Sequence, residues 1–246
     1  EEKLGGLTLP ELARVTDYVD WYARSAPDAP AAWFAGTSLT WADLARQVDA
    51  QARAFVGLGL EKGDRIAVLS TPRIEFLVSW LAAMRVGLVY VGLNPRYTSR
   101  ELAHVVGNAR PSTIVALSQF EATDFEPQVE FPFVRHTFRL EAGPTVGVLE
   151  GQAKLQAYAS GLDDGRYAAR VADVTARDAA AIVYTSGSSG APKGAVIPHD
   201  ALVYGPRVAA LAIGLDRPRT ICALPTNHIG CLADLCTGVI VAGGMI

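Results

Sequence analysis

The chain has 246 residues, of which 50% are hydrophobic and 19% are charged, and its formal net charge is −3 at pH 7. This balance is typical of a folded globular chain, because a disordered protein would hold fewer apolar residues and more net charge. A nucleic-acid-binding protein would show an excess of basic residues, so no nucleic-acid partner is expected.

Strand and helix patterns alternate through the first half of the chain. Thr40 with Asp43, and Thr98 with Glu101, have the spacing of capping boxes, and each pair predicts the start of a helix. This alternation predicts an α/β fold with parallel-rich sheets flanked by helices. The expected elements are, in chain order, a helix over 44–55 that ends at Gly57 and Gly59, a strand over 65–70, a helix over 74–86, a strand over 88–91, a helix up to about 108 and a strand over 113–117.

The pattern becomes irregular between 121 and about 164, where prolines interrupt mixed aromatic and acidic residues. One short helix over 152–159 is expected there. His136 lies in this irregular stretch and His104 lies in the helix before it, and the sequence assigns neither a role.

Regular structure is expected again near residue 179. The apolar run 179–185 predicts a buried strand, and 195–198 predicts a second one. His199 and Asp200 follow Pro198 at the start of the next helix, where capping is the expected role.

The last part of the chain is unusually poor in charge. Residues 220–246 carry one charged side chain, Asp234, but polar residues and a proline interrupt the run. A membrane span needs about 20 apolar residues, so we expect a short strand and a later apolar helix instead. The ending of the chain inside an apolar segment suggests a piece of a longer protein, which would expose apolar surface and favour self-association.

The cysteines also lie in this last part. Cys222, Cys231 and Cys236 have no C-x-x-C spacing and no histidine partner at metal-ligand spacing. They are interpreted as reduced core thiols, with no metal site, as in a cytoplasmic protein.

The loop after the strand at 179–185 carries the chemistry. Residues 186–194 read SGSSGAPKG, which combines three hydroxyl groups, three glycines and Lys193. Glycines allow successive N–H groups to form a concave nest for phosphate oxygens, and hydroxyls and a lysine add donors and charge. This is not a Walker A motif, because Lys193 is followed by Gly194 and a strand. The alternative is a flexible connection without a ligand.

Residues 184–195, YTSGSSGAPKGA, resemble the phosphate-loop signature of the adenylate-forming (AMP-binding) superfamily. Further matches follow the family's order at 57–65, at 93–102 (LNPRYTSREL) and at 224–230 (LPTNHIG). The second of these favours the acyl-CoA synthetases. The family's later motifs have no counterpart before Ile246, so the chain resembles an N-terminal fragment, with 1–175 in a first α/β subdomain and 176–246 beginning the phosphate-loop subdomain.

The resemblance implies an acid–CoA ligase. Such an enzyme uses ATP and Mg²⁺ to convert a carboxylic acid to an acyl-adenylate, and then forms a thioester with CoA. The residue that binds Mg²⁺ would lie outside this fragment, which we expect to be inactive alone. The implied phosphate-binding residues are Thr185, Ser186, Gly187, Ser188, Ser189, Gly190 and Lys193, with Lys193 also catalytic, and the implied acyl-pocket residues are Asn227, His228 and Gly230.

Two other function classes remain open at this point. The sequence Gly187-Ser188-Ser189-Gly190 also resembles amidase-signature serine hydrolases, which would need Lys62 or Lys154 as a base in the same site. The third possibility is a nucleotide-binding module without catalysis.

Overall fold

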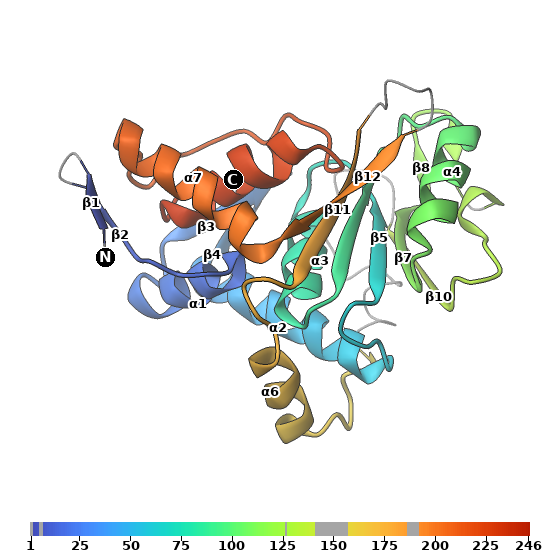
Figure 1. Cartoon of the computed structure of the whole chain (residues 1–246), viewed down its shortest axis with the longest axis horizontal. Coiled ribbons are helices and arrows are strands. Elements are labelled where there is room, and N and C mark those ends of the chain that lie inside the picture. The colour runs from blue at the N-terminus through green and yellow to red at the C-terminus, as the bar shows by residue number, and fades with distance from the viewer. Residues whose placement is uncertain (1, 5–6, 126, 141–156, 186–191) are drawn as a thin grey trace.

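A computed structural model describes residues 2–4, 7–125, 127–140, 157–185 and 192–246. A six-stranded sheet in the order β10-β7-β5-β6-β11-β12 lies at its centre (Figure 1). The first five of these strands run parallel, and β12 pairs antiparallel with β11. Their bounds are β5 Arg65–Leu69, β6 Val89–Leu93, β7 Thr113–Leu117, β10 His136–Leu140, β11 Ala179–Thr185 and β12 Lys193–Pro198.

Helices cover both faces of this sheet. On one face, α4 (Ser99–Ala109) packs in a smaller apolar cluster. The other face carries a larger cluster, to which several helices contribute. Among them are α1 Val15–Ser25, α2 Trp41–Gly57, α3 Ile74–Arg85, α7 His199–Ile213 and α8 Gly238–Val241.

Smaller elements complete the described chain. The helix α6 (Asp164–Ala172) is largely exposed, and a π-helix, η2 (Gly230–Thr237), leads directly into α8. The others are the 3-10 turn η1 Pro127–Val129 and three antiparallel ribbons, β1 Glu2–Leu4 with β2 Leu7–Leu9, β3 Pro30–Phe34 with β4 Thr37–Thr40, and β8 Gln119–Phe120 with β9 Thr123–Asp124.

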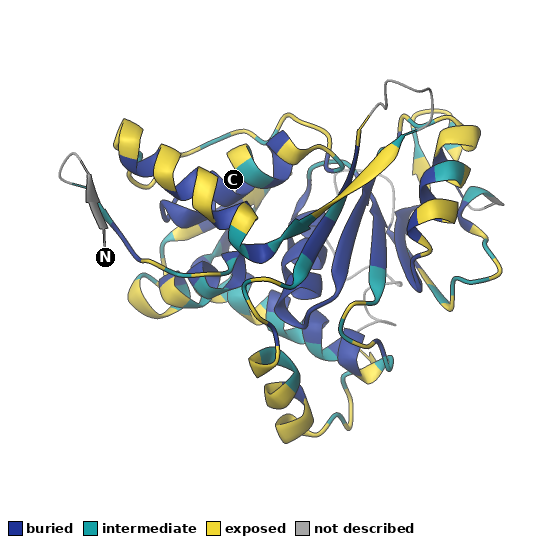
Figure 2. Cartoon of the chain, in the orientation of Figure 1, coloured by how far each residue is buried: buried dark blue, intermediate teal, exposed yellow. Residues whose placement is uncertain are grey.

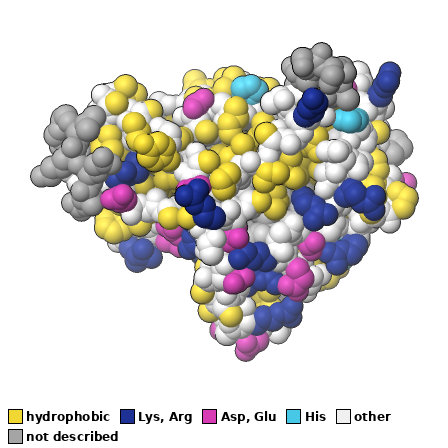
Figure 3. All heavy atoms as spheres, in the orientation of Figure 1, with side chains coloured by type: hydrophobic (Ala, Val, Ile, Leu, Met, Phe, Trp, Pro, Cys, Tyr) yellow, Lys and Arg dark blue, Asp and Glu magenta, His cyan; other side chains and the backbone are white. Residues whose placement is uncertain are grey.

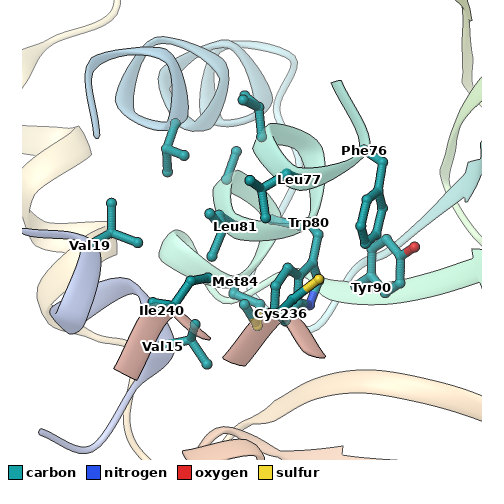
Figure 4. Close-up of a cluster of buried hydrophobic side chains, with 14 of the residues drawn as sticks. Val15, Val19, Phe76, Leu77, Trp80, Leu81, Met84, Tyr90, Cys236 and Ile240 are labelled. Carbon is teal, nitrogen blue, oxygen red and sulfur yellow. The ribbon is translucent and has the colours of Figure 1, made fainter. Parts of the chain in front are cut away.

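Alternation along each central strand explains the two clusters. In β5, Ile66 and Val68 face the larger cluster, whereas Ala67 and Leu69 face the smaller one. A strand that is covered on both faces is therefore apolar throughout, as its sequence is. Figure 2 shows the central strands as mostly buried, and Figure 4 shows side chains of α3, α1 and α8 meeting in the larger cluster.

The two capping boxes are confirmed. The Thr40 hydroxyl accepts from the backbone N–H of Asp43 at the start of α2. Thr98 and Glu101 make the same reciprocal bonds at the start of α4. The predicted helices and strands between residues 44 and 117 all form, with ends within three residues of those expected. Gly59 follows α2 with φ +76°, a left-handed conformation that suits a helix stop.

Three expectations are wrong. The stretch considered irregular contains β10, and His136 begins this strand, which pairs with β7. Residues 220–229 form no strand, and an isolated bridge joins the preceding residue, Arg219, to Met245. His199 does not cap α7, because Pro198 is the N-cap residue and no side chain caps the helix. The helix expected over 152–159 falls largely outside the described residues.

The surface over α7 is notably apolar. Tyr204, Val208 and Ile213 are exposed on this helix, and hydrophobic side chains gather over it in Figure 3. Of the helices described, none combines the length and the apolar character needed to cross a bilayer.

Candidate functional site

The candidate phosphate loop connects two antiparallel strands. Thr185 ends β11 and is paired across the hairpin with Lys193, which begins β12. Both residues are exposed, and Lys193 forms no ion pair with any described residue. The remaining predicted phosphate-binding residues lie outside the described residues; these are Ser186, Gly187, Ser188, Ser189 and Gly190.

The helix α4 holds both ends of this hairpin. The Tyr184 hydroxyl donates to Asn108 Oδ1 at 2.6 Å, which fixes the end of β11. The carbonyl of Pro192, just before β12, lies 2.9 Å from His104 Nε2. A carbonyl can only accept, so this contact requires His104 to carry its proton on Nε2. Sequence reasoning assigned His104 no role, and α4 offers no local signal for these two contacts.

Gly194 follows Lys193 for a packing reason. A Cβ added at this position would lie 2.8 Å from Ile182 Cγ2 and 3.1 Å from Tyr184 Cζ, both on the neighbouring strand. A side chain here would therefore push against β11 and displace Lys193 from its position at the end of the hairpin.

The segment 224–230 is attached to the ends of two parallel strands. The Thr226 hydroxyl donates to the carbonyl of Ser70, directly after β5, at 2.9 Å. The Tyr90 hydroxyl of β6 donates to the Thr226 carbonyl at 3.1 Å. Gly92 permits this approach, since a Cβ there would lie 2.5 Å from Asn227 Cα. The segment thus rests on the carboxyl-terminal halves of β5 and β6.

The candidate acyl-pocket residues differ in exposure. Asn227 is half-buried and its Nδ2 donates to the Tyr97 hydroxyl at 2.9 Å, while its buried Oδ1 has no partner among the described residues. Burial raises the pKa of Tyr97, so this phenol stays protonated. His228 is exposed, and its Nδ1 accepts from the backbone N–H of buried Gly230 at 3.0 Å. Asn227 therefore has a free acceptor beside a fixed phenol.

Both segments lie at one edge of the sheet. Because β5, β6 and β11 are parallel, their carboxyl ends meet at the same edge, where open α/β sheets bind ligands. Lys193 and Thr185 stand at the end of β11, and Asn227 stands over β6. No hydrogen bond or ion pair within the described part of the chain joins Lys193 to Asn227 or His228.

Among the described residues, no three carboxylates lie close enough together to share an ion. Within the described ranges, the one group of three His, Cys, Asp or Glu side chains close enough to share an ion consists of Cys222, Cys231 and Cys236. Mg²⁺ requires oxygen ligands. Mg²⁺ is usually bound by one or two carboxylates together with substrate phosphates, so this group of cysteines is not a candidate Mg²⁺ site.

The chain matches a known family over most of its length. A family model described as AMP-binding enzyme covers residues 19–246. The long-chain-fatty-acid–CoA ligase of Salmonella typhimurium is 28% identical over an alignment of 232 residues that covers 81% of this chain and 40% of that protein. The feruloyl-CoA synthase of Amycolatopsis is 29% identical over 225 residues, 91% of this chain and 41% of that protein. The chain thus spans less than half the length of these relatives.

Solved structures share the fold. An ATP-bound RpMatB-BxBclM chimera is 27% identical, with a TM-score of 0.76 over 96% of this chain and 44% of that one. The N-terminal subdomain of Klebsiella oxytoca NpsA, in complex with 3-hydroxybenzoyl-AMSN, is 22% identical, with a TM-score of 0.73 over 95% of this chain and 53% of that one. At this lower identity the likeness concerns the fold alone.

Proposed function

Because the chain belongs to the AMP-binding enzyme family, we propose that it is part of an acid–CoA ligase that activates a carboxylic acid with ATP. The observation that carries this proposal is the position of Lys193 and of the segment 224–230 at one carboxyl edge of parallel strands. Similarity to both a fatty-acid–CoA ligase and a feruloyl-CoA synthase supports the reaction class and leaves the acid itself open.

The reaction proposed has two steps. A carboxylate oxygen of the acid attacks the α-phosphorus of ATP, and the bond to the β-phosphate oxygen breaks, so that pyrophosphate leaves with the electron pair. The thiolate of CoA then attacks the carbonyl carbon of the acyl-adenylate and displaces AMP. Such phosphoryl chemistry is mostly positioning and charge neutralisation, which a hairpin loop with a lysine can supply.

Lys193 would neutralise charge on the departing pyrophosphate. Its ammonium group is exposed at the end of the hairpin and has no ion-pair partner among the described residues, so nothing there competes with a phosphate for it. Thr185 lies opposite it on β11 and would add a hydroxyl donor. The same role is proposed for the five other loop residues, Ser186, Gly187, Ser188, Ser189 and Gly190.

Asn227, His228 and Gly230 would line the acyl pocket. The free Oδ1 of Asn227 can accept a hydrogen bond from a substrate hydroxyl or amide, while Tyr97 holds the other end of this side chain. Exposed His228 is fixed by the N–H of Gly230.

The same proposal divides the chain into two parts. Residues 1–175 form a first α/β subdomain, and a phosphate-loop subdomain begins at residue 176. It also proposes that residues outside this chain bind Mg²⁺.

The family match disfavours the serine hydrolase. Ser188, Ser189 and Lys154 lie outside the described residues, and Lys62 forms ion pairs with Asp173 and Asp178 instead of facing a nucleophile. A module without catalysis has no observation in its favour.

The test separates the two steps in the complete enzyme. Lys193→Ala should slow acid-dependent ATP–pyrophosphate exchange by about 100-fold or more, because it removes a group that stabilises developing charge. Thioester formation from supplied acyl-adenylate should change much less. Lys62→Ala is a matched control that removes a lysine paired at 2.9 Å with Asp178. Equal losses in both steps for Lys193→Ala would overturn the assignment.

A further inference from the structure

Three thiols from two segments of the chain meet beside the core. Cys222 lies in the segment before the proposed acyl-pocket residues, whereas Cys231 and Cys236 lie on η2. Cys222 Sγ is 3.4 Å from Cys231 Sγ and 3.9 Å from Cys236 Sγ. All three sulfur atoms lie within 4.8 Å of one another. Three sulfur ligands around a tetrahedral ion with bonds of about 2.3 Å would be about 3.8 Å apart, so the thiols already have this spacing.

The π-helix explains how two of them share a face. Cys231 and Cys236 are five residues apart, and i to i+5 hydrogen bonding places more residues in a turn than the 3.6 of an α-helix. Residues five apart therefore lie closer to one side of η2. Cys236 projects from η2 toward Trp80 in the larger core cluster (Figure 4), and Cys231 is fully buried there as well.

The protonation of the three groups is linked. Hydrogen bonds from Cys231 and Cys236 lower the pKa of Cys222, while their contact with Cys222 raises the pKa of both buried partners. The three thiols therefore form one hydrogen-bonded cluster. Binding of a cation would release protons from these thiols, because cysteine binds a metal ion as the thiolate.

A cavity gives access to the cluster. Its volume is about 440 Å³, and its wall includes Cys222, Cys236, Arg219 and Met245. Within this wall, the Arg219 guanidinium lies 3.9 Å from the Met245 sulfur. The cavity also leaves room for a water molecule on the open side of the cluster.

We propose that Cys222, Cys231 and Cys236 bind a thiophilic divalent cation, for which Zn²⁺ fits best, with its fourth position facing the cavity. Zn²⁺ accepts three protein ligands and a water, and thiolate sulfur is among its preferred donors. The sequence spacing C-x8-C-x4-C contains no close pair, so it predicted reduced core thiols instead. The ion would close the segment 222–231, which carries Asn227 and His228. This binding does not depend on the proposed ligase activity.

The test uses the reduced, metal-free chain. Native mass spectrometry with added Zn²⁺ should show one ion per chain, with protons displaced from the thiols that become ligands. The chain has three cysteines, and all of them lie in this cluster. The number of cysteines that an alkylating reagent modifies therefore reports on this site alone, and Zn²⁺ should protect all three from reaction. Cd²⁺ should produce a thiolate charge-transfer absorption in the ultraviolet.

Two variants define the site. Cys222→Ser keeps the two buried thiols and should weaken Zn²⁺ binding by on the order of 100-fold or more, since changes outside the ligand shell already cost 10–100-fold. Met245→Leu removes the other sulfur on the cavity wall and should leave Zn²⁺ affinity unchanged. Three results would overturn the proposal. The first is that the folded wild-type chain binds no Zn²⁺ at micromolar concentration. The second is that Cys222→Ser binds Zn²⁺ as tightly as the wild type. The third is that the metal-free thiols form a disulfide while the reduced chain binds no ion.

Discussion

Acidification should destabilise the chain through His199. This side chain is fully buried, and neither ring nitrogen has a hydrogen-bond partner among the described residues. Burial lowers the pKa of His199 from 6.5 to about 4, with the charge of Arg14 acting in the same direction. Between these two values the unfolded chain binds a proton that the folded chain does not. The stability contribution is therefore present above about pH 6.5 and is lost as the pH falls toward 4.

The size of the effect follows from the same shift. At about 1.36 kcal/mol per pKa unit, the free energy of unfolding should fall by about 3 kcal/mol between pH 7.5 and pH 4 or below. Most of this loss, about 2.5 kcal/mol, should have occurred by pH 4.5. Carboxylates such as Asp43, whose pKa is lowered by its bonds to Thr40, also titrate at the acid end, so the wild type alone cannot isolate the histidine.

Urea unfolding of two variants isolates the contribution of His199 to the pH dependence of stability. His199→Leu and His199→Gln both lack the titrating group but differ in polarity, so their stabilities at pH 7.5 will differ. Relative to the wild type, each should gain about 2.5 kcal/mol between pH 7.5 and pH 4.5. If both variants instead track the wild type in parallel over this range, His199 is not buried in its neutral form and the reasoning is wrong.

Four further predictions concern the site and the surface. Gly92→Ala should destabilise the chain by about 1–3 kcal/mol in urea unfolding, since its Cβ would meet the Asn227 backbone at 2.5 Å; Gly107→Ala, with no atom within 4 Å, should be neutral or stabilising. His104→Ala, which frees the Pro192 carbonyl, should raise KM for ATP in the complete enzyme with little change in KM for the acid. Equal increases in both would contradict this. The 246-residue chain alone should show no acid-dependent ATP–pyrophosphate exchange, and measurable exchange would refute that. Its apolar α7 face should cause self-association, which a monodisperse monomer in light scattering would exclude.

Local signals predicted most of the fold. The capping boxes at Thr40 and Thr98 depend on residues three apart, so the sequence reveals them directly. The strand β10 is different, since only Phe138 and Leu140 in its five residues are buried. Its pairing with β7, more than 20 residues earlier, provides the order that its own pattern lacks. Such non-local pairing has no signature within a short window of sequence.

The candidate site, like the fold, could be predicted from the sequence only in part. The composition of the loop with Lys193 and the sequence around Asn227 identified both segments. The contacts that hold them were not predictable, because His104 and Pro192 are 88 residues apart and Tyr97 and Asn227 are 130 apart. The cysteine cluster was missed because the π-helix, and not the residue spacing, brings its members together.

The attachment of the β11–β12 hairpin has a mechanical consequence. Six residue pairs join β11 to β12, but only two, Ala181 with Tyr90 and Ile182 with Val91, join β11 to β6. β11 is thus paired with β12 along its whole length but with β6 only near its middle. The end that carries Lys193 lies beyond the pairing with β6, so the hydrogen bonds of Tyr184 and Pro192 with α4 are what would resist its displacement when a phosphate binds.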